Sequence, residues 1–135
     1  MTYQECLDWL FTQLPMYQRV GGAAYKADLS NTHKLMDLLD HPENKFKSVH
    51  VAGTNGKGST IAFMRAMLEA AGKRVHVYAS PHLTHFNERF RLAGTFVDDK
   101  RLNETLERIE KINAGQTITF FEITTAVAFD LFCQV

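Results

Sequence analysis

The stretch HVAGTNGKGST at residues 50–60 constrains the fold of this chain more than any other feature. It follows KSVHVA at 47–52, a β-branched run typical of a strand. After it, STIAFMRAMLEAAGKR at 59–74 has the periodicity of a helix, with a shared apolar face made of Ile61, Met64, Met67 and Leu68. A further run, RVHVYA at 74–79, predicts a second strand. Strand, loop, helix and strand in this order predict a βαβ unit and therefore a parallel sheet with a right-handed crossover.

The rest of the chain predicts further helices and one more strand. Thr2 and Glu5 have the spacing of a capping box, and Pro15 closes the helix that they begin. Asp98 and Asp99 can cap a charged amphipathic helix. In chain order, the predicted elements are a helix at 3–14, a loop at 16–30, a helix at 31–40, a third strand at 89–94, and helices at 98–113 and 119–135. The predicted fold class is α/β, with a mostly parallel sheet flanked by helices.

Composition excludes several classes of partner. The 135 residues, about one domain in length, carry 15 Lys plus Arg and 15 Asp plus Glu. No net charge therefore draws the chain to nucleic acid or to anionic lipid, and any anion must be held locally. Two cysteines do not make a disulfide framework, the N-terminus lacks a basic signal-peptide region, and no apolar run approaches the roughly 18 residues of a membrane span. These features predict a reduced, cytoplasmic setting without nucleic acid or membrane as a partner.

The glycine loop lies where phosphates bind, between the end of a predicted strand and the start of a predicted helix. Free N–H groups of the first helical turn and the helix dipole both favour an anion there. The glycines let the backbone turn tightly, Lys57 adds a positive charge, and the hydroxyls of Ser59 and Thr60 suit a phosphate or a phosphate-bound Mg²⁺. The spacing departs from the usual G-x-x-x-x-G-K-[ST] pattern, since only Thr54 and Asn55 separate the first two glycines. The alternative is a surface turn with an incidental lysine.

Four stretches together resemble the folylpolyglutamate synthases and dihydrofolate synthases of the Mur ligase superfamily. GTNGKGST at 53–60 is similar to the ATP loop (P-loop) of that family, and SPHLTHFNERFRLAG at 80–94 is similar to its Ser-Pro-His-Leu segment and the strand that follows. TFFEITTAVAF at 119–129 resembles the start of a family helix, and YKADLSNT at 25–32 is a weaker match. The stretches span nearly the whole chain in the family's order. The resemblance implies that residues 1–135 form the N-terminal part of a Mur-ligase-like ATP-binding domain.

The resemblance also implies roles for individual residues. The phosphates of ATP would lie against Thr54, Asn55, Gly56, Lys57, Gly58, Ser59 and Thr60, and Lys57 would reach the transferring γ-phosphate as the catalytic residue. Ser80 matches a family serine that ligates Mg²⁺, and Ser59 offers a second hydroxyl. Contacts to the pteroate part of the substrate are implied for Ala27, Asp28, Leu29, Thr119, Phe120, Phe121 and Glu122.

The implied reaction is a ligation in folate biosynthesis and one-carbon metabolism. ATP phosphorylates a carboxylate, either of dihydropteroate or of a folate's glutamyl tail, and the amine of L-glutamate attacks the resulting acyl phosphate. Because an anionic carboxylate must approach an anionic phosphate, a lysine, Mg²⁺ and backbone N–H groups would provide most of the catalysis by stabilising charge.

The substrate residues also have structural interpretations. Phe120 and Phe121, at the start of an apolar helix, could belong to the core. Glu122 could be a helix N-terminal charge favoured by the dipole. Asp28 could be a solvated charge unless substrate is present.

The histidines are assigned structural roles. His82 and His85 have a spacing that could suggest zinc, but no other ligand cluster lies near them in the sequence. His50 and His76 lie on predicted strands and are expected to be packed rather than catalytic.

Members of the resembling family continue well beyond the point that corresponds to Val135, with further Mg²⁺ ligands, more sheet and a C-terminal domain for the amino acid. The chain is therefore interpreted as an N-terminal fragment that is inactive alone and has an unpaired sheet edge able to self-associate. Two other functions remain open, another Mur-type amino-acid ligase and a non-catalytic nucleotide-binding module. The choice between dihydropteroate and reduced folate also stays open.

Overall fold

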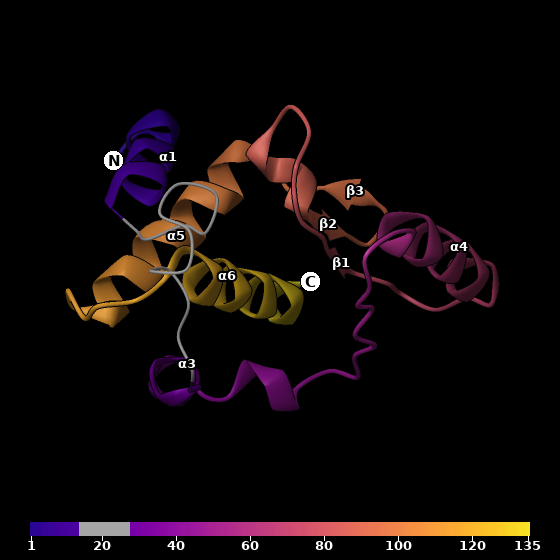
Figure 1. The fold of residues 1–135 in the computed structure, drawn as a ribbon, viewed down its shortest axis with the longest axis horizontal. Coiled ribbons are helices and arrows are strands. Elements are labelled where there is room, and N and C mark those ends of the chain that lie inside the picture. Colours follow the sequence, from indigo (N-terminus) through magenta and orange to yellow (C-terminus); the bar gives the residue numbers. More distant parts are fainter. Residues whose placement is uncertain (14–27) are drawn as a thin grey trace.

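The computed structural model describes residues 1–13 and 28–135 (Figure 1). The longer helices are α1 (Tyr3–Gln13), α3 (Ser30–Leu38), α4 (Lys57–Ala70), α5 (Asp99–Asn113) and α6 (Phe120–Gln134). Between them lie two 3-10 turns, η2 (Pro42–Asn44) and η3 (Phe86–Arg89), and three short strands, β1 (Val77–Tyr78), β2 (Phe90–Leu92) and β3 (Thr95–Phe96). None of the described helices is both long and apolar enough to span a membrane.

A helical core surrounds α6. Helices α3 and α5 pack against α6, and α1 packs against α5 (Figure 1). On α5, Leu102, Leu106 and Ile109 recur at intervals of three and four residues and are all buried, as expected for an amphipathic helix. Helix α6 is buried along most of its length, including Ile123 and Val127. The predicted buried helix at 119–135 is therefore confirmed.

Side-chain caps fix where α5 and α6 begin. The carboxylate of Asp98 accepts a hydrogen bond from the Arg101 amide at 2.8 Å. At α6, the Thr119 hydroxyl accepts from the Glu122 amide at 3.2 Å, and the Glu122 carboxylate accepts from the Thr119 amide at 2.8 Å. This reciprocal pair is a capping box. The cap predicted at Asp98 is confirmed.

Replacing Asp98 with alanine should lower the free energy of unfolding by about 1 kcal/mol, because it removes the acceptor at the start of α5. Urea denaturation followed by circular dichroism measures the change. Lys100→Ala lies in the same helical turn without a capping role and should stay within about 0.5 kcal/mol of the unmodified chain. Equal losses in the two variants would show that the cap is not the source.

The three strands form one antiparallel sheet in the order β1-β2-β3. Val77 lies opposite Arg91 between β1 and β2, and Leu92 lies opposite Thr95 between β2 and β3. Both residues of the loop 93–94 have positive φ, 47° and 96°, as the favoured two-residue hairpin turn requires. The predicted third strand is confirmed as β2.

The parallel pairing predicted from the βαβ pattern does not form among the described residues. Residues 47–52, predicted as the first strand, belong to no strand, and Val49 is 69% exposed. The segment 74–79 contributes β1, which pairs with β2 in antiparallel fashion. β-Branched residues favour extended backbone but do not select a partner strand, and here the chain returns through η3 so that β2 pairs with β1. The parallel pairing was predicted wrongly because the local sequence does not specify which strand each segment pairs with.

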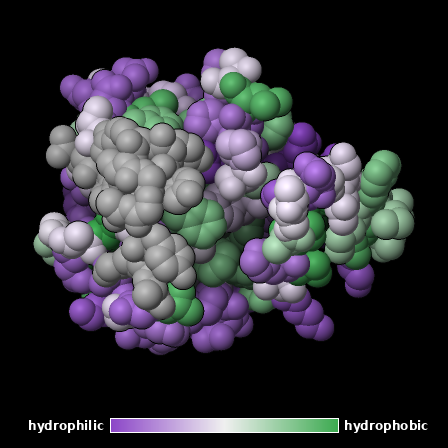
Figure 2. All heavy atoms as spheres, in the orientation of Figure 1, coloured by the Kyte–Doolittle hydropathy of each residue, from purple (hydrophilic) through white to green (hydrophobic). Residues whose placement is uncertain are grey.

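Helix α4 follows the glycine loop as predicted but lies apart from the helical core (Figure 1). None of its residues is buried, and Phe63 and Met67 are 70% and 64% exposed. Figure 2 shows hydrophobic surface at the end of the molecule where α4 lies. Self-association through such unpaired surface stays a prediction.

Candidate functional site

The glycine loop ends on the residue that precedes α4. That residue, Gly56, has a φ of 77°, in the left-handed region that favours glycine. A Cβ added there would meet no atom within 4 Å, so the φ rather than crowding requires a glycine. The first intrahelical hydrogen bond runs from the Thr60 N–H to the Gly56 carbonyl at 2.9 Å. The N–H groups of residues 57–59 therefore have no acceptor within the helix, which is the arrangement that binds anions.

Lys57 folds back over this loop. Its half-buried side chain donates hydrogen bonds from Nζ to the carbonyl oxygens of Gly53 and, at 3.5 Å, Thr54. Among the described residues, no carboxylate forms an ion pair with it. Its positive charge is thus held at the loop by neutral oxygens and remains available to an anion.

The loop after β1 is folded around Glu88. The Glu88 carboxylate accepts hydrogen bonds from the amides of Leu83, Thr84 and His85 at 2.9, 3.0 and 2.7 Å. These backbone hydrogen bonds, that of His85 first, lower the pKa of Glu88 because they favour its charged form. Ser80 lies exposed at the start of the loop. Sequence reasoning missed this role of Glu88, although its capping-box spacing from His85 was a usable signal.

Two neighbouring phenylalanines at the start of α6 differ in how far they are exposed. Phe120 is 5% exposed and stacks on Phe11 at a centroid distance of 5.5 Å, whereas Phe121 is 61% exposed. The core interpretation therefore holds for Phe120 and fails for Phe121. Glu122 is buried and caps Thr119, which matches its interpretation as a helix-terminal charge.

The first turn of α3 lies close to the segment just before α6. Asn31 donates a hydrogen bond to the carbonyl of Thr117 at 2.7 Å, which ties the two segments together. Asp28 accepts hydrogen bonds from the amide and hydroxyl of Ser30 at 3.0 and 2.7 Å, and Leu29 is 63% exposed. Ala27 lies outside the described residues. No hydrogen bond among the described residues joins the glycine loop to this region.

The histidines separate into packed and exposed groups. His76 stacks on Phe132 at 5.4 Å, and burial lowers its pKa, so it is packed as predicted. His50 is exposed, and its predicted packing is wrong because its segment pairs with no strand. His82 accepts a hydrogen bond at Nδ1 from Arg89. Within the described part of the chain, no three His, Cys, Asp or Glu side chains gather to hold a metal ion.

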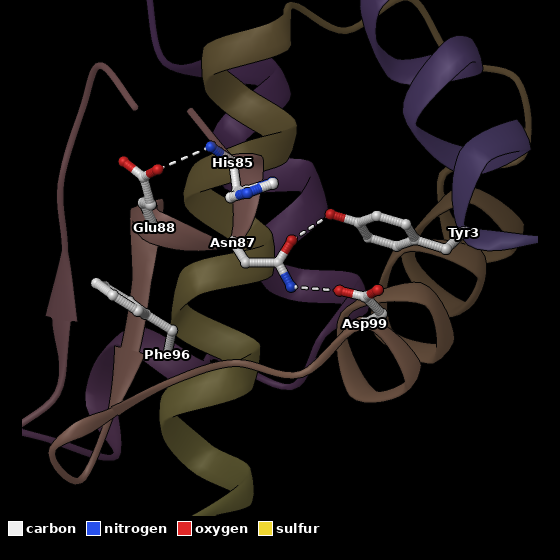
Figure 3. Close-up of a pocket in the computed structure, with 6 residues that line it drawn as sticks. All are labelled: Tyr3, His85, Asn87, Glu88, Phe96 and Asp99. Atoms are coloured by element: carbon white, nitrogen blue, oxygen red, sulfur yellow. Dashed lines mark hydrogen bonds between the residues drawn. The ribbon is translucent and has the colours of Figure 1, made fainter. Parts of the chain in front are cut away.

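A pocket of about 530 Å³ lies beside the 80–88 loop, lined by Tyr3, His85, Asn87, Glu88, Phe96 and Asp99 (Figure 3). Tyr3 from α1 and Asp99 from α5 both point toward Asn87 (Figure 3). The Tyr3 hydroxyl donates to the Asn87 carbonyl oxygen, and the Asn87 amide donates to Asp99 at 2.9 Å. No pattern in the sequence indicated this pocket, because its lining residues come from separate elements.

Comparisons with known proteins place the chain among folate ligases, although no family model matches it. It is 37% identical to the dihydrofolate synthase/folylpolyglutamate synthase of Bacillus subtilis, over 98% of this chain and 30% of that protein. A folylpolyglutamate synthase solved with AMPPCP and folate aligns with a TM-score of 0.86 at 29% identity, over 99% of this chain and 33% of that one. The bifunctional enzyme of Yersinia pestis, solved with AMPPNP and a manganese ion, aligns with a TM-score of 0.84 at 31% identity, over 99% and 31%.

The chain has the fold of the Mur ligases. The relatives that share this fold are ATP-dependent ligases. Within that class, the chain belongs to the dihydrofolate synthase/folylpolyglutamate synthase family. It spans about 30% of the length of the Bacillus relative. The family and the Mur-ligase-like α/β fold predicted from the sequence are confirmed. The predicted parallel sheet does not form among the described residues, and the individual site residues stay predictions.

Proposed function

We propose that this chain binds ATP and the pteroate end of the acid substrate in a ligase that adds L-glutamate to dihydropteroate or to the glutamyl tail of folate. In this proposal, residues 1–135 form the N-terminal part of the ATP-binding domain. The observation that carries it is the glycine loop, where Lys57, without a carboxylate partner among the described residues, stands beside the free N–H groups of residues 57–59. Both solved relatives carry nucleotide analogues in their complexes.

The proposed roles at the loop follow from charge. Residues 54–60 would hold the ATP phosphates, and the Lys57 ammonium would lie against the γ-phosphate as a carboxylate oxygen attacks its phosphorus and ADP leaves. Glutamate's amine would then attack the acyl carbon, and phosphate would leave. The lysine and the N–H groups would stabilise the negative charge that gathers in both steps.

The hydroxyl groups of Ser59 and Ser80 are suited to coordinate Mg²⁺. Both residues are exposed, and neither hydroxyl has a hydrogen-bond partner among the described residues. Mg²⁺ prefers oxygen ligands and keeps several waters, so a few protein hydroxyls suffice to anchor it. When bound, the ion would neutralise phosphate charge.

The pteroate part would lie between the start of α6 and the segment before α3. Phe121 offers an exposed ring there, tilted 39° to the ring of Tyr78 at 6.4 Å, and Leu29 offers an exposed aliphatic side chain. Exposed aromatic faces suit a planar ring system. Thr119, Phe120 and Glu122 would act by fixing the helix start that presents Phe121, and Asp28 would supply a polar contact.

Separate calorimetric titrations with ATP·Mg²⁺ and with dihydropteroate test this function. We expect the chain to bind both. Binding of ATP alone would point instead to another Mur-type ligase or a nucleotide-binding module, and binding of neither would contradict the proposal.

We expect residues 1–135 alone to show no glutamate-dependent ATP turnover, because the chain spans only about 30% of the length of the Bacillus relative. ADP release in the presence and absence of glutamate measures this. Glutamate-dependent release would overturn the expectation.

A further inference from the structure

Arg89, at the end of η3, is a buried cation enclosed by aromatic rings. It is 4% exposed, and its guanidinium carbon lies 5.1 Å from the ring centroid of Phe120 and 5.5 Å from that of Phe86. Its Nε donates a hydrogen bond to Nδ1 of His82 at 2.9 Å. Aromatic faces attract a cation but leave its charge uncompensated.

No carboxylate of the described residues forms an ion pair with this charge. The stretch 14–27, LPMYQRVGGAAYKA, contains no Asp or Glu. Burial lowers the pKa of Arg89, which reflects the unfavourable environment of the charged form. Since a buried charge is costly unless it is paired, the site favours an incoming anion.

The guanidinium retains hydrogen-bonding capacity beyond its contact with His82. Among the described residues, the other polar side chain that acts on it is the Tyr78 phenol, whose oxygen accepts a hydrogen bond from the guanidinium and raises the pKa of Arg89. That phenol already shares a hydrogen bond of 2.8 Å with the hydroxyl of Thr124. A planar guanidinium with unused N–H groups matches the two oxygens of a carboxylate.

The position of Arg89 connects it to the proposed substrate region. Its neighbours His82 and Tyr78 are both half-buried, and Tyr78 contacts the exposed ring of Phe121. The cluster therefore reaches the surface between the loop after β1 and the start of α6.

We infer that Arg89 binds the carboxylate of the acid substrate and so selects acids over neutral analogues. This inference rests on the proposed function and identifies the residue that recognises the reacting group. A carboxylate is favoured over a phosphate because the glycine loop and Lys57 already provide a separate site for phosphates.

The test compares dihydropteroate with its carboxamide, which has the same rings and no charge, by calorimetry on the full chain. The unmodified chain should prefer the acid by about 10- to 100-fold, as expected for charge-assisted hydrogen bonds. Arg89→Met should remove this preference and leave carboxamide binding within about twofold. Arg91→Met is the matched control, because Arg91 lies two residues further along the chain, in β2, with its guanidinium over Phe96, and it should keep the preference.

Arg89→Lys covers the case in which Arg89→Met does not fold, because lysine keeps the charge and loses the planar fork. It should retain a preference for the acid that is several-fold smaller than that of the unmodified chain.

The inference would be overturned if Arg89→Met or Arg89→Lys preferred the acid as strongly as the unmodified chain does. Equal binding of acid and carboxamide by the unmodified chain would also overturn it. A loss of ATP·Mg²⁺ affinity in Arg89→Met with the acid preference intact would assign the anion as a phosphate and also overturn it. Failure of the unmodified chain to bind either pteroate compound would instead contradict the proposed function.

Discussion

Replacing Lys57 with methionine should weaken the binding of ATP·Mg²⁺ by roughly 100-fold. Methionine preserves most of the side-chain length and removes the charge held over the loop carbonyls. A pair of unit charges about 4 Å apart at an effective dielectric near 20 interacts by roughly 4 kcal/mol. After desolvation we expect about 3 kcal/mol of this to remain, which corresponds to the stated loss. Isothermal calorimetry measures the affinity directly.

Lys73→Met provides the matched control for this variant. Lys73 is an exposed lysine just beyond the opposite end of α4, so its loss changes net charge equally but lies away from the glycine loop. Its affinity for ATP·Mg²⁺ should match that of the unmodified chain. A similar loss in both variants would mean that net charge, rather than the loop, attracts the nucleotide.

Replacing Phe120 with alanine should lower the free energy of unfolding by about 3–5 kcal/mol. The ring is almost fully buried, and it packs on Phe11 and Phe86 and under the Arg89 guanidinium. Its removal would leave a cavity at the junction of α1, η3 and α6. Urea denaturation followed by circular dichroism measures the effect.

Phe121→Ala makes the same chemical change one residue along the chain, at a ring that is 61% exposed. Stability should change by less than about 0.5 kcal/mol. Dihydropteroate binding should weaken by about 2- to 10-fold, because aromatic contacts of this kind contribute roughly 0.5–1.5 kcal/mol. If Phe121→Ala were the more destabilising variant, or left dihydropteroate binding unchanged, the assignment of the two rings would be wrong.

This pair of phenylalanines marks the limit of what the sequence could predict. The 3.6-residue periodicity and the caps predicted α5 and α6 closely, because both signals are local. Both rings of the TFFE stretch were equally apolar in the sequence, and only the packing of α1 and η3 against α6 decides which one is buried.

The sheet illustrates the same limit at longer range. The run at 74–79 correctly indicated a strand around Val77, whereas the run at 47–52 forms no strand. Strand formation depends on contacts between distant segments, which a local run does not specify. The glycine loop was predictable because its chemistry lies within a few consecutive residues, from Gly53 to Thr60. The buried charge of Arg89 was not, since its surroundings come from η3, β1 and α6 together.

We propose above that the glycine loop at the start of α4 holds the phosphates of ATP. Backbone amide chemical shifts of isotopically labelled protein, recorded during titration with ATP·Mg²⁺, test it most directly. We expect the largest changes at the amides of residues 56–60, where the N–H groups of 57–59 lack intrahelical acceptors. Shift changes confined to other segments, or none at saturating nucleotide, would contradict it.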